Sequence, residues 1–317
     1  MIEQQGGDQG YGAVAAPEAT IGRGTPVATT LPRARGKSKL RPDERAFLWI
    51  SRVIIWLFML AIIFPVVMVV LAAFSPGQAF YTTSLLPSSL TLQHFQNVLD
   101  PNHVDFLIWV RNSMFVCVGS GILSVVLVAS TGYAFSRFRF KGKKYGLMTL
   151  LLIQMFPVQM SFIAFYVLLL KVHLLSSLWG LLLVYLGGGI PFNAWLFKGY
   201  VDGLPRDLEE SAYVDGATRW QAFYKIVLPL TRPMMAVIFI FVVIGNYNEY
   251  ILANFLISDS SKRTLAVGLQ LFIYTQFNQN WTDFAAAAVL ASLPILILFL
   301  IAQRWLVSGL AAGAVKG

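Results

Sequence analysis

The chain contains 317 residues, of which 57% are hydrophobic and 12% are charged, and its formal net charge is +9. A soluble domain needs about 25% charged residues to cover its surface, so this composition excludes an ordinary soluble enzyme and predicts a chain surrounded by lipid. The one cysteine, Cys117, lies in an apolar run, which excludes a disulfide framework.

The chain begins with a polar segment and continues with a series of apolar ones. Residues 1–40 are rich in Gly, Ala, Thr and Pro without any apolar period, so they are predicted to form a disordered cytoplasmic tail. Each apolar segment in residues 45–317 reaches the roughly 20 residues that cross a hydrocarbon core as a helix. The segments lack the alternation of barrel strands, and unpaired backbone groups are not tolerated in lipid, so an all-α membrane protein is predicted. The six expected transmembrane helices are 53–74, 114–135, 145–170, 176–197, 233–257 and 284–303.

The distribution of Lys and Arg predicts the orientation. Twenty of the 24 lie before the first span, after the last, or in the second–third and fourth–fifth connections, and four lie in the remaining connections. Because basic residues accumulate on the cytoplasmic side, the N- and C-termini are both predicted to be cytoplasmic. The same asymmetry accounts for the net positive charge, so we expect membrane lipid and no nucleic acid as a partner.

The connection at 199–231 is the most informative part of the predicted cytoplasmic face. Pro205 suits a first helical position, and acidic residues follow in the first turn, where the helix dipole favours them. Gly216 can take a positive φ and end this helix, after which Thr218 begins a second, with Gln221 at the capping-box position. A short charged helix that ends in a glycine turn is suited to a groove on another protein. The acidic residues are Asp207, Glu209 and Glu210, the apolar ridge is Leu204, Leu208 and Ala212, and Pro229 is expected to stop the second helix.

Polar residues inside the predicted spans are candidates for a translocation path. A carboxylate such as Glu249 costs about 2.5–3.5 kcal/mol at membrane depth on insertion scales and normally faces a cavity or a partner. Asn246, Glu249 and Tyr250 would share one helical face, next to Asn248, and Gln154 lies in the third span. Two interpretations stay open: these residues line the path, or they form interhelical hydrogen bonds that hold the bundle together.

The sequence contains no recognisable nucleotide motif, metal-ligand cluster or catalytic constellation. We therefore expect a transport subunit, with no catalytic residue, metal or cofactor of its own, whose energy comes from a partner. A proton- or sodium-coupled secondary transporter is the less favoured alternative, because it would show inverted repeats and several intramembrane ionisable groups.

Part of the 199–231 connection matches a known motif. Glu210-Ser211-Ala212 is followed after three residues by Gly216, after nine more by Ile226, and after one more by Leu228-Pro229. This stretch resembles the EAA motif of bacterial ABC-importer permeases, with serine in place of one alanine. The spacing of the fixed positions and their place in a predicted cytoplasmic connection make a chance match improbable.

The resemblance extends over about residues 45–317 and is closest to the MalG-type permeases of maltose and maltodextrin importers. Segments such as Gln154-Met155-Phe156-Pro157 and Leu265-Ala266-Val267-Gly268 also carry it, whereas the long N-terminal tail departs from the pattern. The resemblance implies the ABC-importer permease fold, in a multi-pass subunit of the bacterial inner (cytoplasmic) membrane.

The partners implied by this resemblance are two ATPase subunits, a companion permease and an external sugar-binding protein. ATP and Mg would belong to the ATPase subunits, and the transported sugar would be maltose or maltodextrin, with trehalose or another oligosaccharide as the alternative. The helix from Leu204 to Gly216 would enter a cleft of the ATPase, where Glu210 would meet a basic residue. The implied ATPase-docking residues are Leu208, Glu210, Ser211, Ala212, Asp215 and Gly216, with a further contact from Val315, Lys316 and Gly317.

Overall fold

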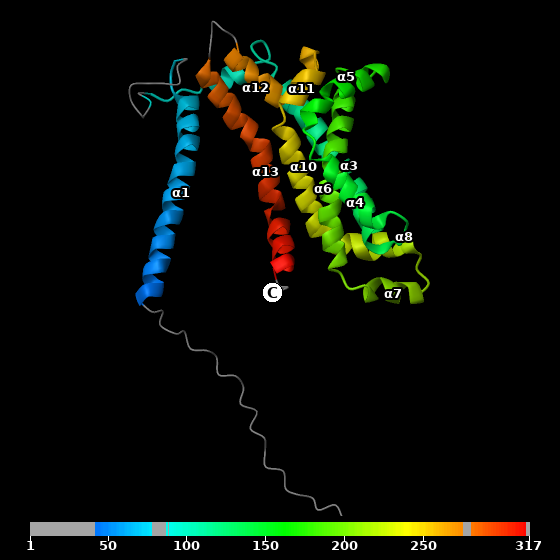
Figure 1. Cartoon of the computed structure of the whole chain (residues 1–317). Coiled ribbons are helices and arrows are strands. Elements are labelled where there is room, and N and C mark those ends of the chain that lie inside the picture. Colours follow the sequence, from blue (N-terminus) through cyan, green and yellow to red (C-terminus); the bar gives the residue numbers. More distant parts are fainter. Residues whose placement is uncertain (1–41, 78–86, 88, 275–279, 315–317) are drawn as a thin grey trace, which may run out of the picture. The chain divides into compact units, whose positions relative to one another are not determined.

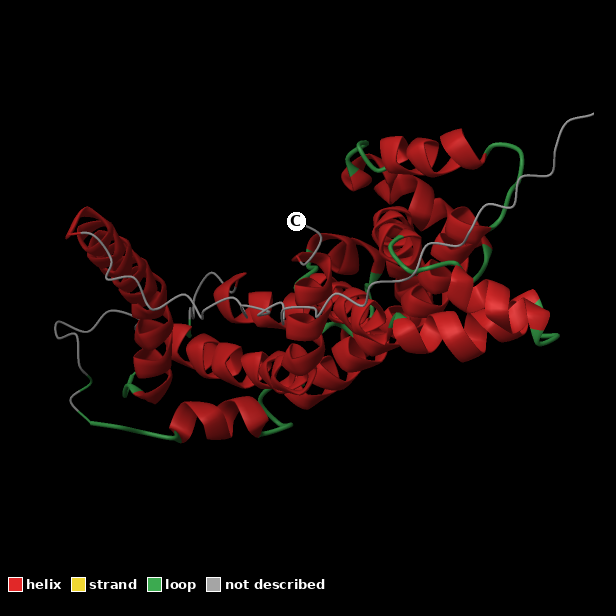
Figure 2. Cartoon of the chain, turned by 90° about the horizontal axis from the view of Figure 1, so that it is seen from below, coloured by secondary structure: helices red, strands yellow, loops and turns green. Residues whose placement is uncertain are grey.

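The computed structural model describes residues 42–77, 87, 89–274 and 280–314, and the regular secondary structure in these ranges is helical (Figure 2). The tail expected at 1–40 lies outside the described residues, as do Val315, Lys316 and Gly317. The chain divides into two units, residues 1–59 and 60–317. The described part of the first unit, residues 42–59, belongs to helix α1 (Pro42–Phe74).

The second unit is built on the helices α3 (Phe106–Arg137), α6 (Leu178–Asp202), α10 (Arg232–Tyr247) and α13 (Trp281–Ala314). Helix α3 packs along α6 and α10, and α10 packs along α13 (Figure 1). Three clusters of buried side chains form the core, and α3 contributes to each of them, with Trp109 in the first, Val116 in the second and Val128 in the third. Helix α3 is therefore the central element of this unit.

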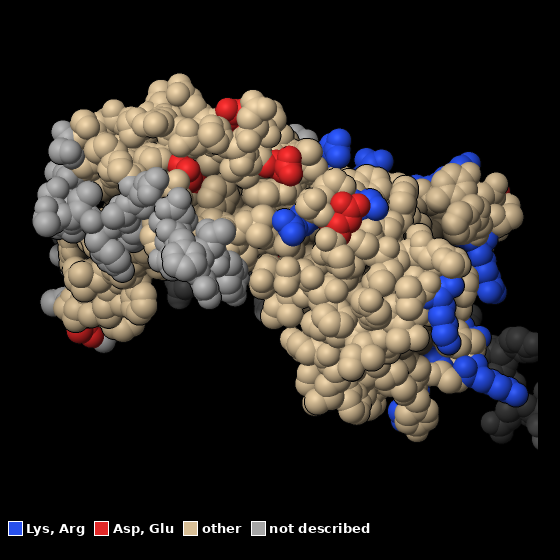
Figure 3. All heavy atoms as spheres, turned by 90° about the horizontal axis from the view of Figure 1, so that it is seen from above, with Lys and Arg blue, Asp and Glu red and all other residues tan. Residues whose placement is uncertain are grey.

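Shorter helices lie at the two ends of the second unit. Figure 1 shows α7 and α8 at one end, and α11 and α12 at the other. Viewed from the end that carries α11 and α12, most of the surface belongs to residues that are neither acidic nor basic (Figure 3). The remaining elements are α2 (Gln93–Leu99), α4 (Lys143–Ile153), η1 (Val158–Ser161), α5 (Phe162–Lys171), α7 (Asp207–Val214), α8 (Arg219–Ala222), η2 (Phe223–Val227), α9 (Leu228–Leu230), α11 (Ile251–Leu256), η3 (Ser260–Lys262) and α12 (Leu265–Tyr274).

Four of the helices, α1, α3, α6 and α13, are long and apolar enough to cross a membrane. Two bent pairs of helical segments reach the same length: α4 with η1 and α5, which meet at 88°, and the stretch from α8 to α9 with α10, which meet at 73°. The described residues thus provide four candidate spans, or up to six if each bent pair is one span. The helices predicted at 145–170 and 233–257 are both interrupted in the structure.

The break in the third predicted span falls at residues 154–157. Pro157 has no backbone N–H, and its ring disfavours a helical conformation at the preceding residue. By contrast, α1, α6 and α13 continue through Pro65, Pro191 and Pro294. Of these four prolines, Pro157 lies at a break and the other three lie within helices, and the sequence alone does not distinguish the two cases.

The break in the fifth predicted span falls at residues 248–250, between α10 and α11. The carboxylate of Glu249 accepts hydrogen bonds from the backbone N–H groups of Leu252, at 2.7 Å, and Ala253, at 3.0 Å, at the start of α11. This side chain satisfies donors that have no partner within the helix. Asn246 belongs to α10, whereas Glu249 and Tyr250 lie within the break, so the prediction that these three residues share one helical face was wrong.

Candidate functional site

Helix α7 is a short element held by local bonds at its C-terminal end. Gly216 has a φ of 85°, as predicted, which is the left-handed conformation that glycine adopts without strain. The N–H of Ala217 donates to the carbonyl of Ala212 at 2.9 Å, and the N–H of Gly216 donates to that of Tyr213 at 3.1 Å. This pair of bonds is the Schellman motif that closes a helix. The helix itself begins at Asp207, later than the expected Leu204.

The predicted capping box then begins α8. The hydroxyl of Thr218 accepts from the N–H of Gln221 at 3.2 Å, and the side-chain oxygen of Gln221 accepts from the N–H of Thr218 at 2.8 Å. The helical run that starts with α8 continues through η2 and α9 and ends at Leu230, one residue beyond the expected stop at Pro229, with a bend at Thr231. Pro229 lies near the end of this run, two residues before the bend.

The outer surface of α7 and α8 combines apolar and acidic side chains. Leu208 is 44% exposed, Val214 is 87% exposed and Trp220 is 66% exposed. Large apolar side chains with this exposure, surrounded by charges, are typical of a protein interaction site. The predicted docking residues lie on α7 and its closing turn: Leu208, Glu210, Ser211, Asp215 and Gly216 are exposed, and Ala212 is half-buried.

Glu209, the residue next to Glu210, faces the opposite way. Its side chain is 6% exposed and receives a hydrogen bond at 2.5 Å from Nε of Arg137, whose side chain is 8% exposed. The hydroxyl of Tyr133 donates to the second carboxylate oxygen of Glu209 at 2.8 Å. The sequence marked Glu209 as a favourable first-turn charge, but it carried no signal that linked this residue to Arg137, 72 positions earlier in the chain.

A second polar group lies around the break between α10 and α11. Glu249 accepts from the hydroxyl of Tyr185 at 2.6 Å, and the side-chain amide of Asn246 donates to the hydroxyl of Ser120 at 2.8 Å. Asn246 and Glu249 also line a cavity of about 560 Å³ together with Asn193. These side chains form interhelical hydrogen bonds and also face a cavity. Both interpretations left open by the sequence, a lining of the path and a bond between helices, therefore have support.

The two other path candidates lie apart from this group. The amide of Asn248 donates to the carbonyl of Ile244 on its own helix at 2.8 Å. Gln154 donates to the carbonyl of Gly188 at 2.6 Å and lines a neighbouring cavity of about 1100 Å³. The structure thus brings Asn246 and Glu249 to one cavity and places Gln154 at another.

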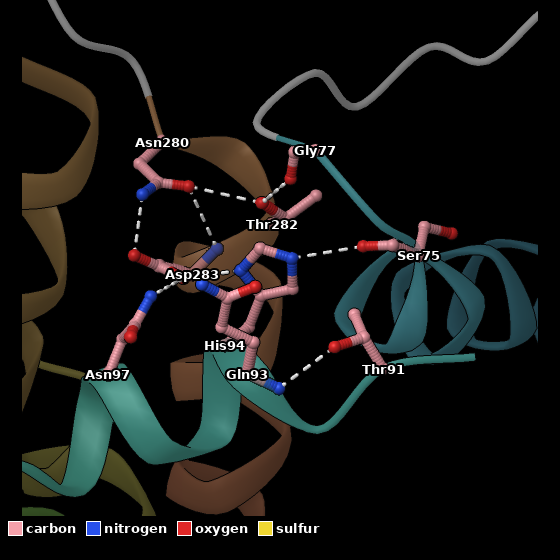
Figure 4. Close-up of polar contacts among 9 residues, drawn as sticks. All are labelled: Ser75, Gly77, Thr91, Gln93, His94, Asn97, Asn280, Thr282 and Asp283. Carbon is pink, nitrogen blue, oxygen red and sulfur yellow. Dashed lines mark hydrogen bonds and ion pairs between the residues drawn. The ribbon is translucent and has the colours of Figure 1, made fainter. Parts of the chain in front are cut away.

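A polar cluster that the sequence did not predict lies where α1, α2 and α13 meet (Figure 4). The ring nitrogens of His94 lie 2.6 Å from a carboxylate oxygen of Asp283 and 2.9 Å from the carbonyl oxygen of Ser75. Asn97 and Asn280 also donate to Asp283. His94 of α2 therefore connects Asp283, at the start of α13, with the residue that follows α1.

Within the residues that the structure describes, no group of three or more His, Cys, Asp and Glu side chains is arranged to hold a metal ion. The charged clusters around Glu209, Glu249 and Asp283 join helices through hydrogen bonds.

Comparison with known proteins gives consistent results. Residues 131–311 match the family model described as the binding-protein-dependent transport system inner membrane component. The maltose/maltodextrin transport system permease protein MalG of Vibrio vulnificus (strain YJ016) is 43% identical over 286 residues, which cover 85% of this chain and 96% of the relative. The maltodextrin transport system permease protein MdxG of Bacillus subtilis (strain 168) is 40% identical over 258 residues, which cover 81% of this chain and 92% of the relative.

A solved structure shares the fold. It is a chain in the crystal structure of a bacterial ABC transporter involved in the import of the acidic polysaccharide alginate, with a TM-score of 0.74, 23% identity, and coverage of 84% of this chain and 99% of that one. The family model and the relatives at 40% identity or more span most of the chain, including α7 and its closing turn. The chain belongs to the family of binding-protein-dependent transport system inner membrane components.

Proposed function

We propose that this chain is the permease subunit of an ATP-driven importer of maltose and maltodextrins, and that α7 is the element through which a separate ATPase acts on it. The observation that carries the proposal is the outward surface of α7, where exposed Leu208 and Val214 accompany the exposed Glu210. A soluble partner with an apolar groove and a basic residue fits this surface. ATP and Mg would be bound by the ATPase subunits.

The exposed surface of α7 offers two kinds of side chain for docking, apolar and acidic. Apolar side chains at the centre of a contact exclude water, and a charge at its edge fixes orientation and partner choice. Leu208 and Val214 are suited to the first role, and Glu210 to the second. Gly216 keeps the turn free of a side chain, so that the partner can approach the backbone closely.

The membrane part would form the translocation path with a companion permease, and an external binding protein would deliver the sugar. Two relatives support a maltodextrin substrate, since MalG is a maltose/maltodextrin transport system permease and MdxG is a maltodextrin transport system permease. The cavity bordered by Asn246 and Glu249 offers hydrogen-bonding groups of the kind that sugars require. We assign the chain to the bacterial inner membrane, with α7 and both termini in the cytoplasm.

A second substrate class is favoured by one specific observation. The galactooligosaccharides transport system permease protein GanQ of Bacillus subtilis (strain 168) is 38% identical over 257 residues. This identity is close to that of the maltodextrin permeases, so the sequence of this subunit alone separates the two sugar classes poorly. Trehalose is a further oligosaccharide to test.

The deciding experiment is purification of the complex through a tag on this subunit, followed by reconstitution with its binding protein. We expect an ATPase subunit to co-purify, and we expect maltose and maltotriose to stimulate ATP hydrolysis more than galactobiose or trehalose. Recovery of the subunit without any ATPase would contradict the docking assignment. If only a galactoside stimulates ATP hydrolysis, the docking assignment stands, and the proposed substrate becomes a galactooligosaccharide.

A further inference from the structure

Two consecutive glutamates of α7 have opposite environments. Glu210 is exposed, whereas Glu209 is buried and paired with Arg137, the last residue of α3. Successive residues of a helix are rotated by about 100°, so one of two neighbours can face a partner while the other faces the protein. The motif that resembles the permease family begins at Glu210 and leaves Glu209 without an assigned role.

Arg137 contacts the α7 segment in two places. Its Nε atom is 2.5 Å from a carboxylate oxygen of Glu209, and its Nη2 atom donates to the backbone carbonyl of Leu204 at 3.0 Å. Tyr133, one turn earlier on α3, donates to the other carboxylate oxygen, and its ring lies 4.6 Å from that of Phe223 in η2. The end of α3 thus contacts both the entry to α7 and the helical run that follows it.

Separate bonds join the ends of α3 and α6 into one base. Ser136 of α3 donates to Asp202 of α6 at 2.5 Å, and Asp202 also pairs with Lys198 at 2.5 Å. Close packing reinforces this base, because a Cβ atom at Gly132 would lie 3.0 Å from the backbone oxygen of Ala194. The Glu209–Arg137 pair is therefore the ionic connection between this base and α7.

We propose that Glu209 and Arg137 are positioning residues that transmit displacement of the ATPase-docked α7 to α3. Helix α3 reaches all three core clusters, and its Ser120 holds Asn246 at the cavity between the helices. A buried ion pair with several hydrogen bonds resists separation, since either charge alone would be left in an apolar environment. The inference rests on the proposed docking of α7, and it gives the two glutamates different roles. Glu210 binds the ATPase, and Glu209 transmits the displacement of α7 to the membrane helices.

The test compares Glu209→Gln with Glu210→Lys in the complete complex, reconstituted in proteoliposomes with its binding protein. Two quantities are measured: the amount of ATPase recovered with the tagged subunit, and the sugar taken up per ATP hydrolysed. We expect Glu209→Gln to retain the ATPase and to lower uptake per ATP about tenfold, a typical size for coupling between two sites. The reversed pair, Glu209→Arg with Arg137→Glu, is expected to recover most of this loss.

Tyr133→Phe provides a milder variant in case Glu209→Gln does not assemble. It removes one hydrogen bond to Glu209 and keeps the ion pair and the ring contact with Phe223, and we expect a smaller fall in uptake per ATP. Wild-type uptake per ATP in Tyr133→Phe and in assembled Glu209→Gln would overturn the inference. If Glu210→Lys retains the ATPase and transport, the docking assignment fails instead, so the two failures are distinguishable.

Discussion

Glu210 stands on the exposed side of α7, where its charge is available to a partner. Glu210→Lys would place a positive charge against the basic residue expected in the ATPase groove. Like charges at an interface oppose association, so we expect docking to weaken by about 2 kcal/mol or more, which is roughly 30-fold. The measurement is ATPase recovery on a tagged subunit, and Glu210→Asp, which keeps the charge, should retain most of the binding.

Gly216 is the residue that closes α7, and its φ of 85° suits few side chains. Gly216→Val is expected to strain the turn by about 1–2 kcal/mol and to reduce ATPase recovery, because the angle of α7 against the membrane part would change. Gly216→Asn is the matched control, since asparagine tolerates this conformation. Equal recovery for the two variants would show that the turn conformation is not required.

Single residues with local partners were predictable, and those with distant partners were not. The Gly216 turn and the Thr218–Gln221 capping box depend on residues within a few positions, so the sequence contains all the relevant chemistry. The His94–Asp283 pair joins residues 189 positions apart. Nothing in the sequence ranks Asp283 above other acidic residues as a partner for His94, because the choice depends on how the helices pack.

At the scale of elements, the α3–α6 contact depends on a glycine. A Cβ atom at Gly132 would lie 2.8 Å from the ring of Phe197 and 3.0 Å from the backbone oxygen of Ala194. Gly132→Ala is therefore expected to separate the two helices at a cost of about 1–3 kcal/mol, measurable as a lower melting temperature of the purified complex. Gly199→Ala, where a Cβ atom would meet nothing within 4 Å, should leave that temperature unchanged or slightly higher.

The cluster in Figure 4 joins helix α2 to the ends of α1 and α13. His94→Ala removes two buried hydrogen bonds and leaves the acceptor on Asp283 partly unsatisfied, so we expect a loss of about 1–3 kcal/mol in stability. Thermal unfolding of the complex would report this loss. His103→Ala is the control, because His103 is an exposed residue whose nearest acidic partner is 3.7 Å away; an equal effect of both variants would contradict the role of the cluster.

The positions of the long helices were predictable, whereas the breaks were not. Uniformly apolar sequence places α1, α3, α6 and α13 where they occur, because lipid requires such runs. The breaks near Pro157 and Glu249 depend on which backbone donors find partners after folding. The composition of a segment shows over what length it is apolar. It does not show whether a polar side chain within the segment will bind backbone N–H groups and interrupt the helix.

At the scale of the whole molecule, the proposed orientation in the membrane can be tested by labelling introduced cysteines. Cys117, the one cysteine of the sequence, is buried, so the native chain should react little with a membrane-impermeant maleimide. A cysteine at the exposed Val214 is expected to react in inside-out vesicles, and one at the exposed Ser260 in right-side-out vesicles. The opposite pattern would place α7 outside the cell and exclude an intracellular ATPase as its partner.

The bonds that close α7 involve residues of this chain alone. Since the Schellman turn and the capping box are formed within residues 212–221, the segment would meet the proposed ATPase groove already shaped. Ordering a flexible loop on contact would subtract from affinity, and here little ordering remains to be done. Repeated engagement and release during a transport cycle can then proceed without refolding the contact surface each time.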